Sequence, residues 1–168
     1  MAESKVRARR AIDVLKEDHE KVKQLFADYE ELGDGAVKSK VRLFEKIRLE
    51  LEVHAKCEEE LIYPAFASVA EEEEHSDMVE EAKEEHNVVK TLLDELGDLT
   101  PEDEAFDAKM AVLSENVEHH VEEEEGELFK LWKKIEESER EEISSRLIER
   151  KRELMEELAG DEDLDEEA

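Results

Sequence analysis

Hydrophobic residues recur every three or four positions along four long segments of the chain. This spacing places them on one side of an α-helix, and such a stripe is typical of helices that pack in a bundle. The pattern predicts four long helices: Lys5–Leu32, Ala36–Tyr63, one from the acidic stretch 71–74 to Gly97, and Thr100–Ile135. We therefore predict an all-α fold, an antiparallel up-down four-helix bundle.

Glycine and proline mark the ends of the predicted helices. Gly33 and Gly35 end the first helix, and Pro64 stops or kinks the second because proline lacks a backbone N–H. Thr100 followed by Pro101 predicts the start of the fourth helix, with Thr100 as its N-cap.

A fifth amphipathic segment, residues 137–159, follows the predicted bundle as an extra C-terminal helix. Its apolar residues, which include Ile143 and Leu147, lie along one side and need a packing partner. That partner is either the bundle or a second subunit, so the sequence leaves both a monomer and a homodimer open. We divide the chain into a bundle domain, 1–136, this helix, and an acidic tail, 160–168, that we expect to be disordered.

The composition agrees with long helices and restricts the partners. Only 5 glycines and 2 prolines interrupt the 168 residues. A formal net charge of -29 argues against nucleic acid, because a phosphate backbone attracts a basic surface. We find no apolar run that could span a membrane and no secretion signal at the N-terminus. Cys57 is the single cysteine, which fits a reducing cytoplasm.

Each apolar stripe carries one histidine near its middle, and two stripes also carry a glutamate. These glutamates follow two of the histidines by four positions, so each pair lies on one face of a helix. The chain repeats this arrangement, since Lys16–His19 resembles Lys83–His86 and the segments after the two glutamates are similar. A helical hairpin used twice brings six residues to one level: His19, His54, Glu58, His86, His120 and Glu124.

The two glutamates require compensation, because a carboxylate buried in an apolar seam costs several kcal/mol. Two divalent cations compensate both glutamates and use all four histidines as ligands. A carboxylate can bridge two metals about 3.5–4 Å apart, the usual spacing of two-metal sites. We therefore predict a two-metal site formed by the six residues. Nitrogen and oxygen ligands alone leave iron, manganese and zinc open.

Three other residues compete for a place in this site. His119 lies beside the seam rather than on it, so we prefer its neighbour His120. His75 lies about three turns before the histidine of the same helix, too far to share the site, and we place it at the surface. We interpret Cys57 as a small buried residue, with a thiol beside the metals as the alternative.

These residues give the segment Ala11–Lys134 a resemblance to the hemerythrin-like, or HHE cation-binding, family. Its marks are two isolated histidines, His19 and His86, and the similar segments His54–Pro64 and His120–Phe129. The resemblance implies a hemerythrin-like bundle with a non-haem di-iron centre. Membership further implies an oxo or hydroxo bridge between the irons, with iron favoured over manganese or zinc.

The chain departs from the oxygen-carrying members of that family. Those proteins have a further histidine one turn along helix three, where this chain has Lys90. They also have His-x-x-x-x-Asp on helix four, where this chain has His-x-x-x-Glu. The set of four histidines and two glutamates is similar to the bacterial iron-centre repair proteins and other non-carrier members. It leaves an open position on both irons, which favours reaction with a small oxidant over reversible carriage of oxygen.

We therefore predict a protein that binds and reacts with hydrogen peroxide, oxygen or nitric oxide, in stress defence or sensing. Catalase- or peroxidase-like turnover and reduction of nitric oxide are the enzymatic forms of this hypothesis. One alternative is a non-enzymatic protein that binds or senses oxygen or iron, or that donates iron. Another is a purely structural metal site, with the fifth helix or the acidic tail binding a partner.

Overall fold

A computed structural model describes residues 9–159, and every regular element in that range is helical. In chain order the elements are α1 (Ala11–Glu30), α2 (Val37–Cys57), the π-helix η1 (Glu58–Ile62), α3 (Tyr63–Val69), α4 (Glu73–Gly97), α5 (Glu104–Gly126), the 3-10 helix η2 (Leu128–Lys134) and α6 (Glu137–Ala159). The predicted all-α fold is confirmed.

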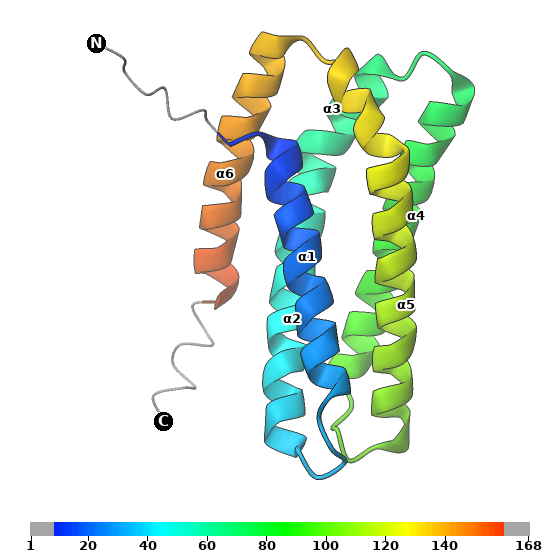
Figure 1. The fold of residues 1–168 in the computed structure, drawn as a ribbon, viewed down its shortest axis with the longest axis vertical. Coiled ribbons are helices and arrows are strands. Elements are labelled where there is room, and N and C mark those ends of the chain that lie inside the picture. The colour runs from blue at the N-terminus through cyan, green and yellow to red at the C-terminus, as the bar shows by residue number, and fades with distance from the viewer. Residues whose placement is uncertain (1–8, 160–168) are drawn as a thin grey trace.

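The four long helices α1, α2, α4 and α5 run alternately up and down (Figure 1). α1 packs mainly on α2, and α4 packs mainly on α5, so the two hairpins of the internal repeat form the two halves of the bundle. The predicted break at Gly33 and Gly35 falls in the turn between α1 and α2. The antiparallel up-down arrangement is therefore confirmed.

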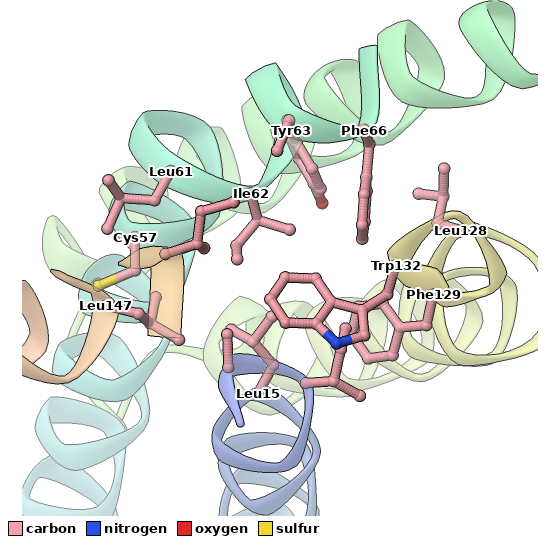
Figure 2. Close-up of a cluster of buried hydrophobic side chains, with 14 of the residues drawn as sticks. Leu15, Cys57, Leu61, Ile62, Tyr63, Phe66, Leu128, Phe129, Trp132 and Leu147 are labelled. Atoms are coloured by element: carbon pink, nitrogen blue, oxygen red, sulfur yellow. The ribbon is translucent and has the colours of Figure 1, made fainter. Parts of the chain in front are cut away.

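The bundle has two hydrophobic cores, and along each long helix the buried histidine lies between them. One core, shown in Figure 2, contains side chains from both ends of the chain, among them Leu15, Ile62, Phe66, Trp132 and Leu147. The other core fills the opposite end of the bundle and includes Phe26, Ile47, Leu93, Phe106 and Leu113. Apolar packing on both sides therefore holds the polar layer between the cores in place.

Of the two outcomes predicted for Pro64, a stop or a kink of the second helix, the stop is wrong. The chain passes from α2 through η1 into α3 and stays helical to Val69. In η1 the backbone N–H of Tyr63 bonds to the carbonyl of Glu58, one residue further back than in an α-helix. Pro64 then lies in the first turn of α3, where a missing N–H is tolerated.

The fourth long helix differs from its prediction at both ends. The Asp103 carboxylate accepts the backbone N–H of Thr100 at 2.8 Å, so the segment 100–103 forms a turn. The helix therefore begins at Glu104 with Asp103 as N-cap, and the assignment of Thr100 as N-cap was wrong. The helix ends at Gly126, a poor helix former, and η2 covers most of the remaining predicted segment.

α6 packs along α1 and α2 on one side of the bundle (Figure 1). Ile143, Leu147 and Leu154 are buried at this contact, as the amphipathic pattern predicted. The extra C-terminal helix is therefore confirmed, and within the described residues its apolar side is covered by the bundle of its own chain.

Two basic residues of α6 also form ion pairs with the bundle. Arg150 donates two hydrogen bonds, of 2.8 and 3.1 Å, to the carboxylate of Glu60 in η1. Lys151 forms an ion pair with Asp18 of α1, which is itself buried. The helix is thus connected to the polar layer as well as to the core.

The ends of the chain lie outside the described residues. The first helix begins at Ala11, and residues 5–8 of its predicted span are not covered, nor is the acidic tail 160–168. The division of the chain into domains at residue 136 stays a prediction. Among the helices within residues 9–159, none combines the length and the apolar character that crossing a membrane requires.

Leu147 tests the contribution of α6 to stability. Its side chain is 1% exposed, so we expect Leu147→Ala to leave a cavity and lower the free energy of unfolding by about 2–5 kcal/mol. The next residue, Ile148, is 41% exposed and is the matched control, for which Ile148→Ala should cost less than about 1 kcal/mol. Urea unfolding followed by circular dichroism measures both variants. Equal effects would contradict the packing of α6 on the bundle.

Candidate metal centre

The six residues predicted from the apolar stripes lie together between the two cores. They come from all four long helices and from η1: His19 of α1, His54 of α2, Glu58 of η1, His86 of α4, and His120 and Glu124 of α5. Each histidine is 7% exposed, and both glutamates have no exposed surface. The side chains therefore meet in a site that is screened from solvent.

Two groups of possible ligand atoms share both glutamates. One group combines Glu58 and Glu124 with His19 and His54, and the other combines them with His86 and His120. Within each group the ligand atoms all lie within 4.8 Å of one another. The arrangement offers each of two cations two imidazole nitrogens and a share of two carboxylates.

The Nε2 atoms of all four histidines face these carboxylates. Their distances to a carboxylate oxygen are 2.7 Å for His54–Glu58, 3.4 Å for His86–Glu58, 3.2 Å for His19–Glu124 and 3.1 Å for His120–Glu124. Each glutamate thus contacts one histidine of each group, which is the geometry that a bridging carboxylate needs.

The opposite ring nitrogens, Nδ1, each face a further carboxylate. The pairs are His19–Glu125 at 3.0 Å, His54–Asp18 at 2.9 Å, His86–Glu59 at 3.9 Å and His120–Glu85 at 3.0 Å. A carboxylate that accepts the Nδ1 proton orients the ring and leaves the Nε2 lone pair free to bind a metal. Outer partners of this kind usually accompany histidines that are metal ligands.

The unbonded oxygens of the two buried glutamates indicate whether cations fit this site. Neither oxygen of Glu58 takes part in a hydrogen bond, and neither does Oε1 of Glu124. A buried carboxylate without hydrogen bonds costs several kcal/mol unless a positive charge compensates it. Cations placed among the Nε2 and carboxylate atoms remove that cost. The donors are imidazole nitrogen and carboxylate oxygen, which suit iron, manganese or zinc.

The sequence matches the hemerythrin HHE cation-binding domain over residues 10–132, a segment that contains all six residues. This chain belongs to that family. The family and the two buried groups of histidine and glutamate together identify a metal-binding protein. The predicted resemblance is confirmed.

Two known proteins are similar to this HHE domain. One is an HHE cation-binding domain protein from Mycobacterium kansasii, whose crystal structure matches with a TM-score of 0.73 over 87% of both chains. At 23% identity this likeness shows a shared fold. The other, named DNA nickase, comes from Nostoc sp. and is 31% identical over 118 residues, or 70% of this chain. The match covers 32% of the nickase, so this chain spans about a third of that relative.

Tyr63 also lies against the candidate ligands, although it was not among the six residues predicted from the sequence. Its hydroxyl donates a hydrogen bond of 2.6 Å to Glu124 Oε2 and lies 3.1 Å from His86 Nε2. Burial raises the pKa of Tyr63, and the charges of Glu58 and Glu124 raise it further, so the hydroxyl keeps its proton. The signal in the sequence was the repeat, in which Tyr63 follows Glu58 by five positions as Phe129 follows Glu124.

Tyr63 in one half of the repeat corresponds to Phe129 in the other, so the surroundings of the two histidine groups differ chemically. Tyr63 stacks on His86 with 5.2 Å between ring centroids, and Phe129 stacks on His19 at 6.0 Å. One histidine group therefore has a hydroxyl beside it, and the other has an apolar ring. Lys90, at the position where oxygen carriers have a further histidine, is exposed on α4.

A small cavity is lined by all four histidines, and Tyr63 is not among its lining residues. Its volume is about 40 Å³, and its apolar wall includes Val22, Leu51, Val89 and Val117. A water molecule needs roughly 10–15 Å³ of such space. The cavity therefore has room for a diatomic molecule or a peroxide next to the proposed ligands.

The three competing residues lie outside the two buried groups. His119 is exposed on α5, next to Glu85 and Glu123. His75 is partly buried in the first turn of α4, rather than fully at the surface as predicted. Cys57 is part of the hydrophobic core, and burial raises the pKa of its thiol to about 11.

Without metal, the neighbouring carboxylates favour the protonated forms of His54, His86 and His120. Burial lowers the pKa of His120, but the carboxylates of Glu124 and Glu85 outweigh burial and raise the pKa from 6.5 to about 10. The same balance raises the pKa of His54 and of His86. Burial raises the pKa of Glu124, but its histidine neighbours outweigh burial and lower it from 4.5.

These shifts predict how the stability of the metal-free protein depends on pH. A raised histidine pKa stabilises the fold below pH 6.5, and this contribution is lost as the pH rises toward about 10. The lowered pKa of Glu124 adds stability above pH 4.5 that is lost in acid. We therefore expect the urea midpoint of the metal-free protein to be highest between these two values and to fall in alkali.

Metal should reverse the alkaline part of this trend, because a cation competes with the protons on Nε2. His120→Gln should flatten the alkaline fall in the metal-free protein, whereas His119→Gln, at an exposed neighbouring position, should leave it unchanged. A urea midpoint of the metal-free protein that rises between neutral and alkaline pH would contradict the proposed charge balance.

Proposed function

We propose that this HHE domain binds two iron ions, one at His19 and His54 and the other at His86 and His120. Both buried glutamates would help to hold each iron, and the protein would react with hydrogen peroxide, oxygen or nitric oxide in stress defence or sensing. The observation that carries the proposal is the pair of buried carboxylates shared by two histidine groups. Family membership favours iron over manganese or zinc.

Iron bound at such a site supplies electrons and open coordination positions to a small oxidant. Two histidines and two shared glutamates leave space at each metal, since within the described residues no further histidine joins either group. The apolar cavity beside the histidines admits a molecule of that size and limits water. These features favour reaction over reversible binding of oxygen.

Tyr63 is the proton donor of the proposed site. Its hydroxyl holds a proton 2.6 Å from Glu124 Oε2 and 3.4 Å from His120 Nε2. Since Phe129 occupies the equivalent place beside His19, a hydroxyl proton lies beside one histidine group only. We therefore assign proton donation to the His86–His120 side.

DNA nicking is not part of the proposal. The name belongs to a relative about twice as long, and the matched segment leaves most of that protein uncovered. A net charge of -29 on this chain repels a phosphate backbone, and all six residues of the two groups are buried.

The first prediction from this proposal concerns metal content. After reconstitution with ferrous iron and oxidation, elemental analysis should find two irons per chain, with a visible absorption band. Glu58→Ala removes a ligand shared by both groups, so we expect less than one iron per chain. His119→Ala changes an exposed histidine and should keep two. Two irons in Glu58→Ala would show that the ligand assignment is wrong.

The second prediction concerns peroxide. The iron-loaded protein should release oxygen from hydrogen peroxide faster than the same amount of free iron. Tyr63→Phe keeps the ring and removes the proton donor, so we expect normal iron content and turnover slowed about 100-fold. Oxygen release equal to that of free iron would exclude the peroxide reaction and favour the non-enzymatic alternative. Equal turnover in Tyr63→Phe would exclude the assigned proton donor.

A further inference from the structure

The two halves of the bundle carry matching ligands but have different outer faces. Between α4 and α5 lies a cleft of about 140 Å³ whose floor includes His120 and Glu124. Besides Glu124, four further carboxylates line it: Glu81, Glu85, Glu123 and Glu127. No lysine or arginine is among its lining residues, although Lys130 reaches Glu127 from outside at 3.5 Å.

A third group of possible metal ligands borders this cleft, two of whose residues, Glu85 and Glu123, line it. Glu85, His119 and Glu123 place one ligand atom each within 4.8 Å of one another. His119 Nε2 lies 3.2 Å from Glu123 and 4.0 Å from Glu85 Oε2. The other oxygen of Glu85 lies 3.0 Å from His120 Nδ1, so Glu85 connects this outer group to the buried site.

The inner end of the cleft independently points to a cation. Glu124 has no exposed surface, yet it lines the cleft together with His120, whose Nε2 lies 3.1 Å from Glu124 Oε2. A buried carboxylate beside an imidazole attracts a cation from a path that reaches it. A continuous series of carboxylates and imidazoles thus runs from the surface to the proposed buried ligands.

The equivalent face on the other half of the repeat is closed. In the repeat, Val14 takes the position of Glu81, since each lies five residues before the histidine of its helix. In the same way Cys57 takes the position of Glu123, since each comes directly before the buried glutamate of its half. Val14 and Cys57 belong to the hydrophobic core.

Leu61 continues this apolar face, since it takes the place in η1 that Glu127 takes after α5. α6 covers this side, whereas α4 and α5 lie away from it (Figure 1). In Figure 2, Leu147 of α6 lies next to Cys57. A cation therefore has a polar path to the centre on one side of the bundle and a packed apolar core on the other.

We infer that the cleft between α4 and α5 is the route by which ferrous iron reaches the buried centre, with Glu85, His119 and Glu123 as a transient outer site. The inference rests on the proposed function, because it presupposes a buried iron centre. Carboxylates along the path replace the hydration water of the cation stepwise, and their negative field raises its local concentration. The His86–His120 group, which borders the cleft, fills first.

The rate of iron uptake tests the route. Metal-free protein is mixed anaerobically with ferrous iron and quenched at intervals into a coloured ferrous chelator that counts unbound iron. Glu81→Gln with Glu123→Gln removes two charges from the cleft, one of them in the outer site, without changing a proposed ligand of the buried centre. We expect uptake to slow by about tenfold or more, with the same final iron content, and the difference to shrink at high salt.

The matched control is Glu118→Gln with Glu122→Gln, two exposed positions of α5 outside the cleft lining that change the net charge equally. Its uptake rate should stay within about twofold of the unmodified protein. His119→Ala should also slow uptake, since it removes the imidazole of the outer site. Equal rates in the two double variants would overturn the inference. Failure of the unmodified protein to bind iron would instead overturn the proposed function.

Discussion

Two glutamates without exposed surface, Glu58 and Glu124, impose the strongest constraint on this molecule. Their charge lies between two hydrophobic cores, where water cannot solvate it. Four histidines face them through Nε2, and three of these, His19, His54 and His120, are oriented from behind by carboxylates within 3.0 Å of Nδ1. The packing on both sides keeps the possible ligand atoms of this layer close together.

The irregular parts of the backbone occur where the chain leaves this layer. η1 begins at Glu58, and its wide turn carries the chain past Pro64 and turns Tyr63 toward the centre. On the other hairpin, α5 ends two residues after Glu124, at Gly126, and a 3-10 helix follows. π-turns inside helices are often found at functional sites, because the extra residue redirects the side chains around it. Here the redirected residue, Tyr63, donates a hydrogen bond to Glu124.

The internal repeat is retained at the ligands and lost around them. Both halves supply two histidines and a glutamate, since each proposed cation needs the same donors. Outside that set the halves differ: α6 covers one face and pairs Lys151 with Asp18 behind His54, whereas the other face stays open and acidic. The neighbours of the metal centre thus distinguish two sites that the ligands alone would make equivalent.

The sequence by itself determined the helical class, the two hairpins and the six residues that converge, because a helix places every third or fourth residue on one face. Their role as ligands is still a prediction, but their meeting in one buried layer follows from apolar stripes that have to face one another. Helix ends were less predictable, because a local bond such as Thr100–Asp103 competes with helix capping. Tyr63, the covering by α6 and the acidic cleft were decided only by the tertiary structure. Each depends on contacts between residues far apart in the chain, which periodicity along a single helix does not encode.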